Sequence, residues 1–239
     1  MGQSQRTQSY YVPREAGPQA GDYWSKAVDP DGVERVRVSE AERLSYLENV
    51  KDELAFIKAL KPGTHADFGS GPGWLIREMP NWDSLAIEIS EDAQAELTHR
   101  HIPWQTTWPR ESSQQVDLIT CLHVIEHLPC PLRAVAKFHS VLRPGGHLII
   151  STPDFGSPCA RRFGDNFRGY HDPTHVSLFT QESLARLLRD FGFTIKDIQF
   201  PFPDKYATPE TFARWHDTTK VSPPWPGNWV TFYCTRGGE

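Results

Sequence analysis

The chain has 239 residues, of which 38% are hydrophobic, 23% charged and 12% aromatic, with a net charge of −5. The apolar fraction is sufficient for a sizeable core, which excludes a wholly disordered chain. No apolar run reaches the roughly 18 residues of a membrane span, and the acidic balance lacks the basic excess of a typical nucleic-acid-binding protein.

The cysteines and the first residues bear on the cellular compartment. Cys121, Cys130, Cys159 and Cys234 form no C-x-x-C pair, and residues 1–8 contain no apolar signal-peptide core. Both features favour a cytoplasmic protein with reduced thiols.

The first third of the chain divides into an irregular part and a helix. Residues 1–38 lack periodicity, and we expect a mobile tail that leads into an ordered aromatic arm. Ser39 and Glu42 have the spacing of a capping box, and apolar residues keep helical spacing from there to Leu60. We therefore expect a single helix that begins after Ser39 and ends before Pro62-Gly63.

Short apolar runs then alternate with helical segments. Expected strands are His65–Phe68, Leu85–Ile89, Val116–Leu122, His147–Ser151, Phe193–Phe200 and Trp229–Thr235. Expected helices are Trp74–Met79, Glu91–Arg100 with Ser90 as cap, Leu132–Leu142 ended by Pro144-Gly145-Gly146, and Gln181–Phe191 between Thr180 and Gly192. This alternation predicts an α/β fold with a mainly parallel sheet that is covered on both faces.

A glycine-rich turn follows the first of these strands. The segment Asp67-Phe68-Gly69-Ser70-Gly71-Pro72-Gly73 opens the next helix, where glycines permit close backbone approach and free amides can bind a ligand. Trp74 stands where a dinucleotide fingerprint G-x-G-x-x-G needs glycine, and the Lys-Ser/Thr of a P-loop is absent. The acid that ends the next strand is Glu88.

At these residues the chain resembles the class I S-adenosylmethionine-dependent methyltransferases. The family's first motif matches at Asp67 and the glycines that follow it, and Glu88 matches the acid that binds both ribose hydroxyls. The block Leu142–Leu148 is similar to the family's loop before strand five. The resemblance covers roughly residues 62–200 and the final strand.

The resemblance implies an enzyme with S-adenosyl-L-methionine as cofactor. It also implies a doubly wound, Rossmann-like, seven-stranded sheet, mostly parallel with an antiparallel last strand, plus an N-terminal helical addition. The chain would divide into residues 1–61 (tail, aromatic arm and helix) and a methyltransferase domain, residues 62–239, with an insertion or lid at 201–228. The implied cofactor-binding residues are Asp67, Gly69, Ser70, Gly71, Gly73, Glu88, Ile89 and Leu122.

One departure from the family concerns the adenine. Most relatives place an Asp after strand three to contact the adenine amine, and residues 102–108 contain no acid. Either Trp104 or Gln105 covers the adenine instead, or both are packing residues.

The segment after strand four contains His123, Glu126 and His127 at positions i, i+3 and i+4, so one helical turn would place all three on one face. H-x-x-E-H is also an inverted metalloprotease motif, but Pro129 and Pro131 interrupt the long helix that a zinc hydrolase needs. A second interpretation is acid–base catalysis, in which His127, with Glu126 and His123, takes a proton from an acceptor hydroxyl.

A third interpretation is a divalent-metal site. Ubiquinone-pathway O-methyltransferases and small-RNA 3′-terminal 2′-O-methyltransferases carry E-x-x-E-H here and use a metal, and the RNA enzymes add a downstream histidine that resembles His175. This resemblance implies a possible metal set of His123, Glu126, His127 and His175. His123 replaces a family Glu, which favours Zn, Fe or Mn over Mg, or else marks loss of the metal.

Two long segments are expected on the acceptor side. Residues 152–180 would lie over the active site, with Arg168, Tyr170, His171 and His175 as candidate substrate residues, and the arginines there suit an anionic acceptor. Residues 201–228 contain six of the 20 prolines and form either an acceptor lid or a rigid surface cover.

These observations predict methyl transfer to an oxygen of a small-molecule or sugar-type metabolite. The alternatives are an RNA 2′-O-methyltransferase with a metal site and a non-catalytic cofactor-binding scaffold. The expected partner is a small-molecule acceptor rather than a nucleic acid, and the oligomeric state stays open.

Overall fold

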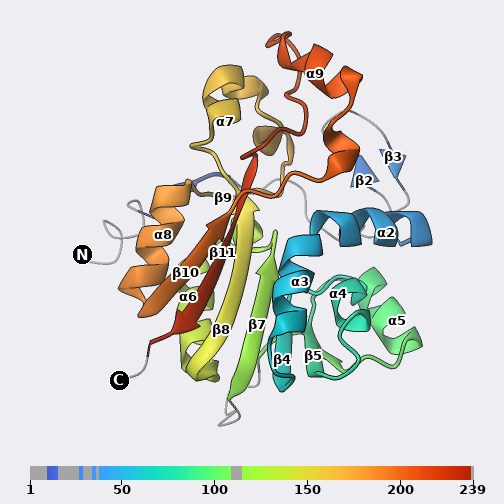
Figure 1. Cartoon of the computed structure of the whole chain (residues 1–239), viewed down its shortest axis with the longest axis vertical. Coiled ribbons are helices and arrows are strands. Elements are labelled where there is room, and N and C mark those ends of the chain that lie inside the picture. Colours follow the sequence, from blue (N-terminus) through green and yellow to red (C-terminus); the bar gives the residue numbers. More distant parts are fainter. Residues whose placement is uncertain (1–9, 16–26, 29–33, 36–37, 109–114, 238–239) are drawn as a thin grey trace.

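The computed structural model describes residues 10–15, 27–28, 34–35, 38–108 and 115–237. The expected mobile tail lies largely outside these residues. A seven-stranded sheet in the order β10-β11-β8-β7-β4-β5-β6 forms the centre of the molecule (Figure 1). Its strands are β4 (Thr64–Phe68), β5 (Asp83–Ile87), β6 (Trp104–Gln105), β7 (Val116–Leu122), β8 (Leu142–Pro153), β10 (Phe193–Gln199) and β11 (Trp229–Arg236).

The sheet has one antiparallel strand between two others. The strands from β8 to β6 pair in parallel, whereas β11 is antiparallel to both β8 and β10. The predicted fold class, a mostly parallel Rossmann-like sheet with an antiparallel last strand, is confirmed. The carboxyl ends of the parallel strands share one edge, where open α/β sheets bind their ligands.

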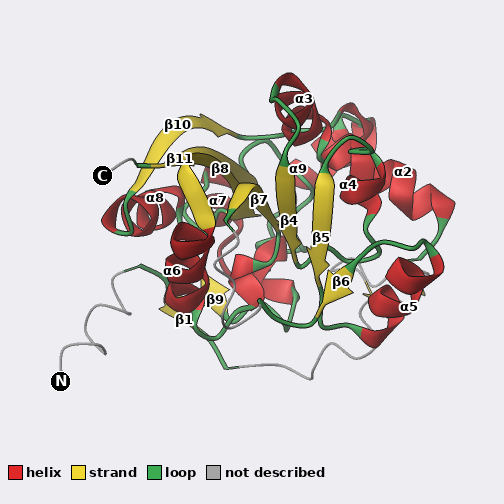
Figure 2. Ribbon diagram, turned by 90° about the horizontal axis from the view of Figure 1, so that it is seen from below, coloured by secondary structure: helices red, strands yellow, loops and turns green. Residues whose placement is uncertain are grey.

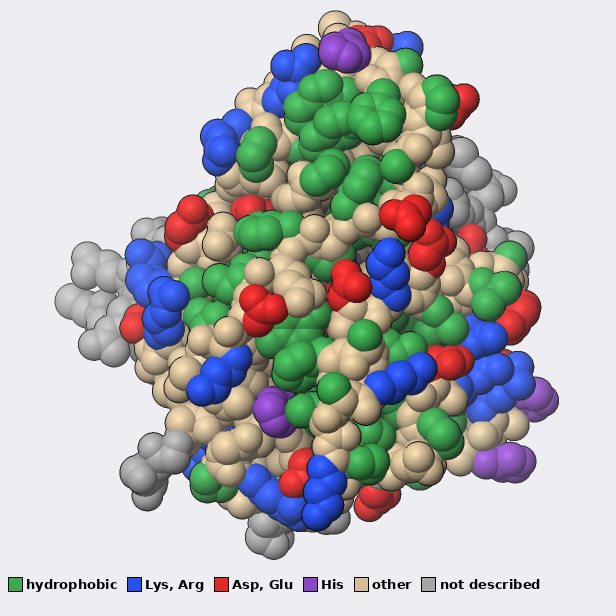
Figure 3. All heavy atoms as spheres, viewed as in Figure 1, with side chains coloured by type: hydrophobic (Ala, Val, Ile, Leu, Met, Phe, Trp, Pro, Cys, Tyr) green, Lys and Arg blue, Asp and Glu red, His purple; other side chains and the backbone are tan. Residues whose placement is uncertain are grey.

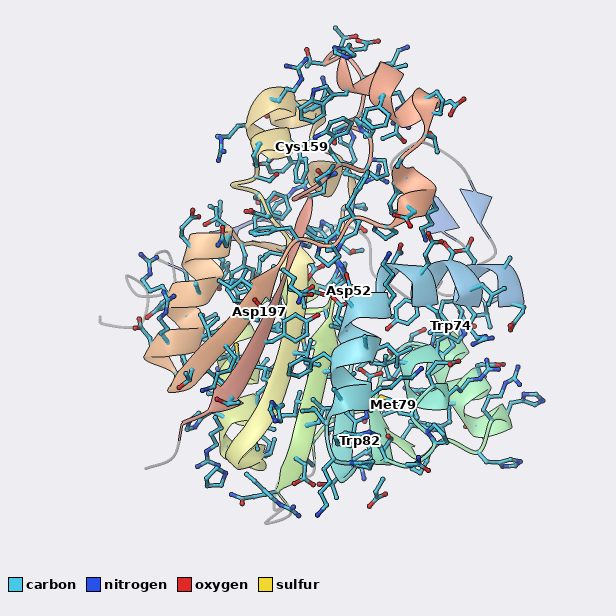
Figure 4. All side chains as sticks on the ribbon, viewed as in Figure 1. Asp52, Trp74, Met79, Trp82, Cys159 and Asp197 are labelled. Carbon is cyan, nitrogen blue, oxygen red and sulfur yellow. The ribbon has the colours of Figure 1, made fainter. Side chains whose placement is uncertain are left out.

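Helices lie on both faces of the sheet. The described residues form α2 (Glu40–Asn49), α3 (Lys51–Ala59), α4 (Trp74–Arg77), α5 (Glu91–His99), α6 (Pro131–Val141), α7 (Pro158–Phe163), α8 (Gln181–Asp190) and α9 (Pro209–Trp215), of which α7 and α9 lie beyond the sheet edge (Figure 1). Figure 2 shows α3 on one face and α6 and α8 on the other. Met79 and Trp82 belong to the apolar cluster under α3 (Figure 4). The helix-capping prediction for α8 is confirmed by bonds between Thr180 and Ser183 in both directions.

The remaining elements are short. They are β1 (Val12–Pro13), β2 (Ala27–Val28), β3 (Glu34–Arg35), β9 (Ser177–Leu178) and the 3-10 turns η1 (Ile125–His127), η2 (Gly164–Asn166), η3 (Arg168–His171) and η4 (Asp204–Tyr206). Strand β1 pairs with β9, and β2 with β3. Among the described residues, no helix is both long and apolar enough to cross a bilayer.

The prediction of a single helix after Ser39 is wrong, because the structure has two helices there. Ser39 Oγ does accept the Glu42 N–H (3.2 Å), but the helix is interrupted at Val50. No side chain of α2 is fully buried, although Tyr46 and Leu47 pack against the cluster, whereas α3 places Leu54 and Ile57 inside it. The break therefore lets α3 follow the sheet while α2 turns away from it (Figure 1).

Two other local predictions need correction. Ser90 is the N-cap residue of α5, as predicted, but its hydroxyl makes no capping bond; its N–H donates to Glu88 Oε1 (2.8 Å). Strand β8 begins at Leu142 and not at His147, because Leu142 already pairs with Val116 of β7 before the register shifts.

The two long connections meet beyond the carboxyl edge of the sheet, above β8 and β11 in Figure 1. They share a small apolar cluster of their own, which includes Cys159 (Figure 4) and Phe167. Trp215 and Trp225 stack there with ring centroids 4.0 Å apart. Figure 3 shows hydrophobic side chains gathered on the surface over α7 and α9. Both connections thus form one cap over the ligand edge.

Candidate active site

The glycine-rich turn adopts a conformation that requires glycine. Gly69, Gly71 and Gly73 have φ values of +73°, +53° and +74°. A Cβ on Gly69 would lie 2.3 Å from Val124 Cγ2, so a side chain is excluded both by the backbone conformation and by the neighbour. The turn therefore holds its backbone amides at the carboxyl end of β4.

Glu88 closes this turn from the neighbouring strand. Its carboxylate accepts the N–H groups of Gly71 (2.7 Å), Ile89 (2.7 Å) and Ser90 (2.8 Å), and its side chain is buried. Charge-assisted bonds of this kind are the stronger hydrogen bonds in proteins. The acid that the resemblance assigns to the ribose thus also links β5 to the glycine turn.

Asp67 ends a buried polar chain beneath the turn. Thr120 Oγ1 donates to Asp67 Oδ1 (2.6 Å), so His65 Nε2 must donate to Thr120 (2.8 Å) and Ser84 to His65 Nδ1 (3.1 Å). Burial lowers the pKa of His65 to about 3, which agrees with this neutral tautomer. Burial, with the nearby Glu88 charge, raises the pKa of Asp67 to about 7 against the effect of Thr120.

The other residues of the expected cofactor set differ in exposure. Ser70 Oγ contacts the Gly71 carbonyl (3.2 Å), and the Ile89 side chain is 75% exposed next to the glycine turn. Leu122 is buried in the cluster under α3. Trp104 donates to Thr98 Oγ1 (2.9 Å) and packs against the α4–α5 cluster, contacts that fit the packing interpretation.

The expectation that His123, Glu126 and His127 share one helical face is wrong. Only Ile125–His127 form a 3-10 turn, and His123 precedes it with a left-handed φ of +55°. His123 Nδ1 nevertheless lies 3.5 Å from Glu126 Oε1, and its ring is 6.1 Å from that of Trp229.

Glu126, His127 and His175 converge instead. One potential ligand atom from each lies within 4.8 Å of the others, whereas His123 does not belong to this group. His175 comes from the segment between η3 and β9, which crosses η1. Its backbone is tied there, because Val176 N–H donates to the Glu126 carbonyl (2.8 Å).

The hydrogen bonds of the two imidazoles define which nitrogen carries a proton. His175 Nδ1 faces the Gly169 carbonyl (2.7 Å), an acceptor, so Nδ1 carries the hydrogen. Thr174 Oγ1 donates to Asp172 (2.5 Å) and therefore accepts from His127 Nδ1 (2.8 Å). In their neutral forms both rings thus present an Nε2 lone pair. Burial lowers the pKa of His175, which favours that neutral form.

Glu126 is the buried acid of this cluster. It has no exposed surface, and neither carboxylate oxygen has a hydrogen-bond partner within the described part of the chain. Burial acts to raise its pKa, but His123, His127 and His175 outweigh burial and lower the pKa to about 2. The result is a buried, ionised carboxylate that faces three imidazole rings in the described part of the chain.

A cavity of about 180 Å³ adjoins the cluster. It is lined by His123, Pro153, Phe167, Arg168, Gly169, Asp172, His175, Asn228 and Trp229. Of the expected substrate residues, Arg168 and His175 line it. Tyr170 packs against Phe155 instead (5.0 Å between ring centroids), and His171 is exposed.

Sequence reasoning missed the other polar wall residues. Asp172 and Thr174 form a D-x-T turn in which Thr174 N–H donates to Asp172 Oδ1 (2.9 Å), and this local pattern was a usable signal. Trp229 begins β11 and Asn228 precedes it, and no local pattern links them to the cavity.

Comparison with known proteins supports the resemblance to methyltransferases that the glycine turn and Glu88 indicated. Residues 40–198 match a family model described as a methyltransferase domain. The ubiquinone biosynthesis O-methyltransferase of Acinetobacter baylyi is 28% identical over 179 residues, which cover 65% of this chain and 71% of that protein.

Solved structures share the fold. An S-adenosylmethionine-dependent methyltransferase from Thermotoga maritima, described as a possible histamine N-methyltransferase, has a TM-score of 0.57 at 20% identity and covers 82% of this chain and 95% of its own. A second, from Archaeoglobus fulgidus, has a TM-score of 0.60 at 16% identity and covers 81% of this chain and 94% of its own.

The family match spans well over half of the chain, so the chain belongs to the methyltransferase-domain family. It is an enzyme of the S-adenosylmethionine-dependent class that the glycine turn and Glu88 predicted.

Proposed function

We propose that this methyltransferase transfers the methyl group of S-adenosylmethionine to a hydroxyl oxygen of a small molecule. The observation that carries the proposal is the cluster of Glu126, His127 and His175 beside a cavity at the ligand edge of the sheet. A cavity of about 180 Å³ is comparable to the ~150 Å³ that holds one benzene ring, which suits a small acceptor. The name of the Acinetobacter relative also supports transfer to oxygen.

The cofactor would bind across the glycine turn and the end of β5. Glu88 would accept the ribose hydroxyls, and Ile89 would present its exposed side chain to the adenine. The residues that we assign to cofactor binding are Asp67, Gly69, Ser70, Gly71, Gly73, Glu88, Ile89 and Leu122.

The cluster fits a divalent cation. Glu126 has buried oxygens without hydrogen-bond partners in the described residues, and His127 and His175 offer Nε2 lone pairs in their neutral forms. A carboxylate with two imidazoles suits Zn, Fe or Mn. When bound, such an ion would supply Lewis-acid polarisation of the acceptor hydroxyl.

The chain's own residues would then perform the remaining work. Methyl transfer is an in-line displacement, so its main requirement is to align acceptor and cofactor. With His127 among the ligands, His123 is our candidate to receive the acceptor proton, because its ring lines the cavity and contacts Glu126. Arg168 in the cavity wall would orient an anionic acceptor.

Metal binding and methyl transfer can be tested together. We expect purified protein to bind about one Co²⁺ or Mn²⁺ per chain in a titration, and chelation to slow transfer from labelled S-adenosylmethionine to a panel of small hydroxyl compounds. Glu126→Gln, which keeps the shape of the side chain, should weaken Co²⁺ binding by at least about tenfold. The matched control Glu182→Gln, in an exposed position of α8, should bind as the wild type does. Equal Co²⁺ affinity of both variants would contradict the metal site.

A second candidate is 2′-O-methylation of RNA, favoured by the position of His175 beside Glu126 and His127. A gel shift with short RNA at physiological salt separates the two, since phosphate contacts dominate RNA affinity. Binding of S-adenosylhomocysteine without transfer to any acceptor would favour the scaffold alternative.

A further inference from the structure

The N-terminal arm lies directly against the segment that carries His175. Val12 and Pro13 form β1 and pair with Leu178 and Ser177 of β9. Beyond this short ladder, the Arg14 N–H donates to the Val176 carbonyl (2.9 Å). The arm thus adds a strand to the outer edge of this segment.

The Arg14 side chain reaches further along the same segment. Its Nη1 donates to the carbonyls of Tyr170 (2.8 Å) and Asp172 (3.5 Å). These two residues precede His175, and Val176 follows it. Arg14 therefore holds the backbone on both sides of His175.

The opposite edge of the segment is held by η1 and the residue after it. Val176 N–H donates to the Glu126 carbonyl (2.8 Å), and Ser177 Oγ donates to the Leu128 carbonyl (2.6 Å). Arm, β9 and η1 thus lie side by side, and the segment that carries His175 is clamped between the other two. Its lateral position relative to Glu126 depends on both edges.

The arm is anchored independently of Arg14. Tyr10 and Tyr11 are buried in the core cluster with α6 and α8, and Tyr10 Oη donates to Asp190 (2.5 Å). The Tyr11 ring packs 5.6 Å from that of Phe179. Arg14 itself is exposed, so its truncation leaves no cavity in the core.

We propose that Arg14 is a positioning residue, which holds residues 170–176 so that His175 stays in register with Glu126 and His127. This inference rests on the proposed function for its consequence, namely affinity for a divalent cation. The clamp on residues 170–176 can be measured without a metal.

The test compares Arg14→Ala and Arg14→Lys with the control Arg100→Ala in the full chain. Arg100 is also exposed and forms a simple ion pair with Glu96 on α5. Arg14→Ala should raise amide hydrogen exchange of residues 170–178 several-fold while exchange in α6 and α8 stays unchanged. It should also weaken Co²⁺ binding about tenfold, the low end for partners that orient metal ligands. Arg14→Lys should show smaller changes in amide exchange and in Co²⁺ affinity than Arg14→Ala, and Arg100→Ala should change neither quantity.

The outcomes separate the two proposals. If the wild type binds no Co²⁺, the metal site fails, and local exchange alone decides the role of Arg14. Unchanged exchange at 170–178 in Arg14→Ala overturns the inference, as does a uniform rise over the whole chain, which indicates general destabilisation. If Arg14→Ala does not fold, Arg14→Lys carries the same comparison, because an ammonium can replace only part of the two-carbonyl contact.

Discussion

The buried Asp67 carboxyl should make the protein less stable as the pH rises, and Asp67→Asn should remove this effect. Burial raises the pKa of Asp67 from an ordinary 3.8 to about 7, so the folded state holds the proton more tightly than the unfolded state. The stability from this proton is complete below about pH 3.8, falls as the pH rises towards 7, and is lost above it.

The magnitude follows from the two pKa values. Their separation of about three units corresponds to about 4 kcal/mol over the full range, at 1.36 kcal/mol per unit. Between about pH 5 and pH 8 the expected loss in the free energy of unfolding from this group is about 2.5 kcal/mol. Asn keeps an oxygen that can accept the Thr120 hydroxyl (2.6 Å to Asp67 in the wild type) but does not ionise.

The assay is urea unfolding of cofactor-free protein at about pH 5 and pH 8. From about pH 5 to pH 8 the wild type should lose about 2.5 kcal/mol of unfolding free energy from this group, and Asp67→Asn should not show this loss. Asp83→Asn makes the same chemical change at an exposed position of β5, and its free energy of unfolding should depend on pH as that of the wild type does. If Asp67→Asn also keeps the wild-type pH dependence, the raised pKa of Asp67 is refuted.

Two further predictions concern the glycine turn. Glu88→Gln replaces one acceptor oxygen by a donor that faces a backbone N–H, so we expect the free energy of unfolding to fall by about 1.5–3 kcal/mol and calorimetry to show weaker S-adenosylhomocysteine binding. If Glu88→Gln keeps both wild-type stability and wild-type S-adenosylhomocysteine affinity, Glu88 does not link β5 to the glycine turn in the way described. Gly69→Ala and Gly145→Ala both place a side chain at positive φ (+73° and +77°), but only Gly69 meets a neighbour, at 2.3 Å from Val124. Thermal unfolding should show a cost of about 1 kcal/mol for Gly145→Ala and a clearly larger one for Gly69→Ala, and equal costs would contradict the clash.

The α/β fold and the cofactor side could be predicted because their signals are local. Apolar periodicity and caps such as Thr180 place most strands and helices within a few residues. The glycines of the Asp67-to-Gly73 segment stand at the positions whose backbone has a positive φ, so the sequence itself indicates this conformation. Errors arose where local patterns were incomplete, as at Val50, where a helix with continuous apolar spacing is interrupted, and at Ser90, which is the N-cap of α5 but makes no side-chain capping bond.

The acceptor side depends on contacts between residues far apart in the chain. The resemblance pointed to His175, but the local spacing of residues could not show that His175 lies near Glu126. The same spacing wrongly placed His123 on one helical face with His127. His175 lies just before β9, in a segment that contacts η1 on one side and, on the other, an arm more than 150 residues earlier in the chain. The sequence by itself determined most strands and helices, their order along the chain and the cofactor turn, because each is specified within a short stretch, and the family resemblance supplied the seven-stranded sheet. Only the tertiary structure decided the ligand cluster and its supports, because such pairings depend on how the whole chain packs.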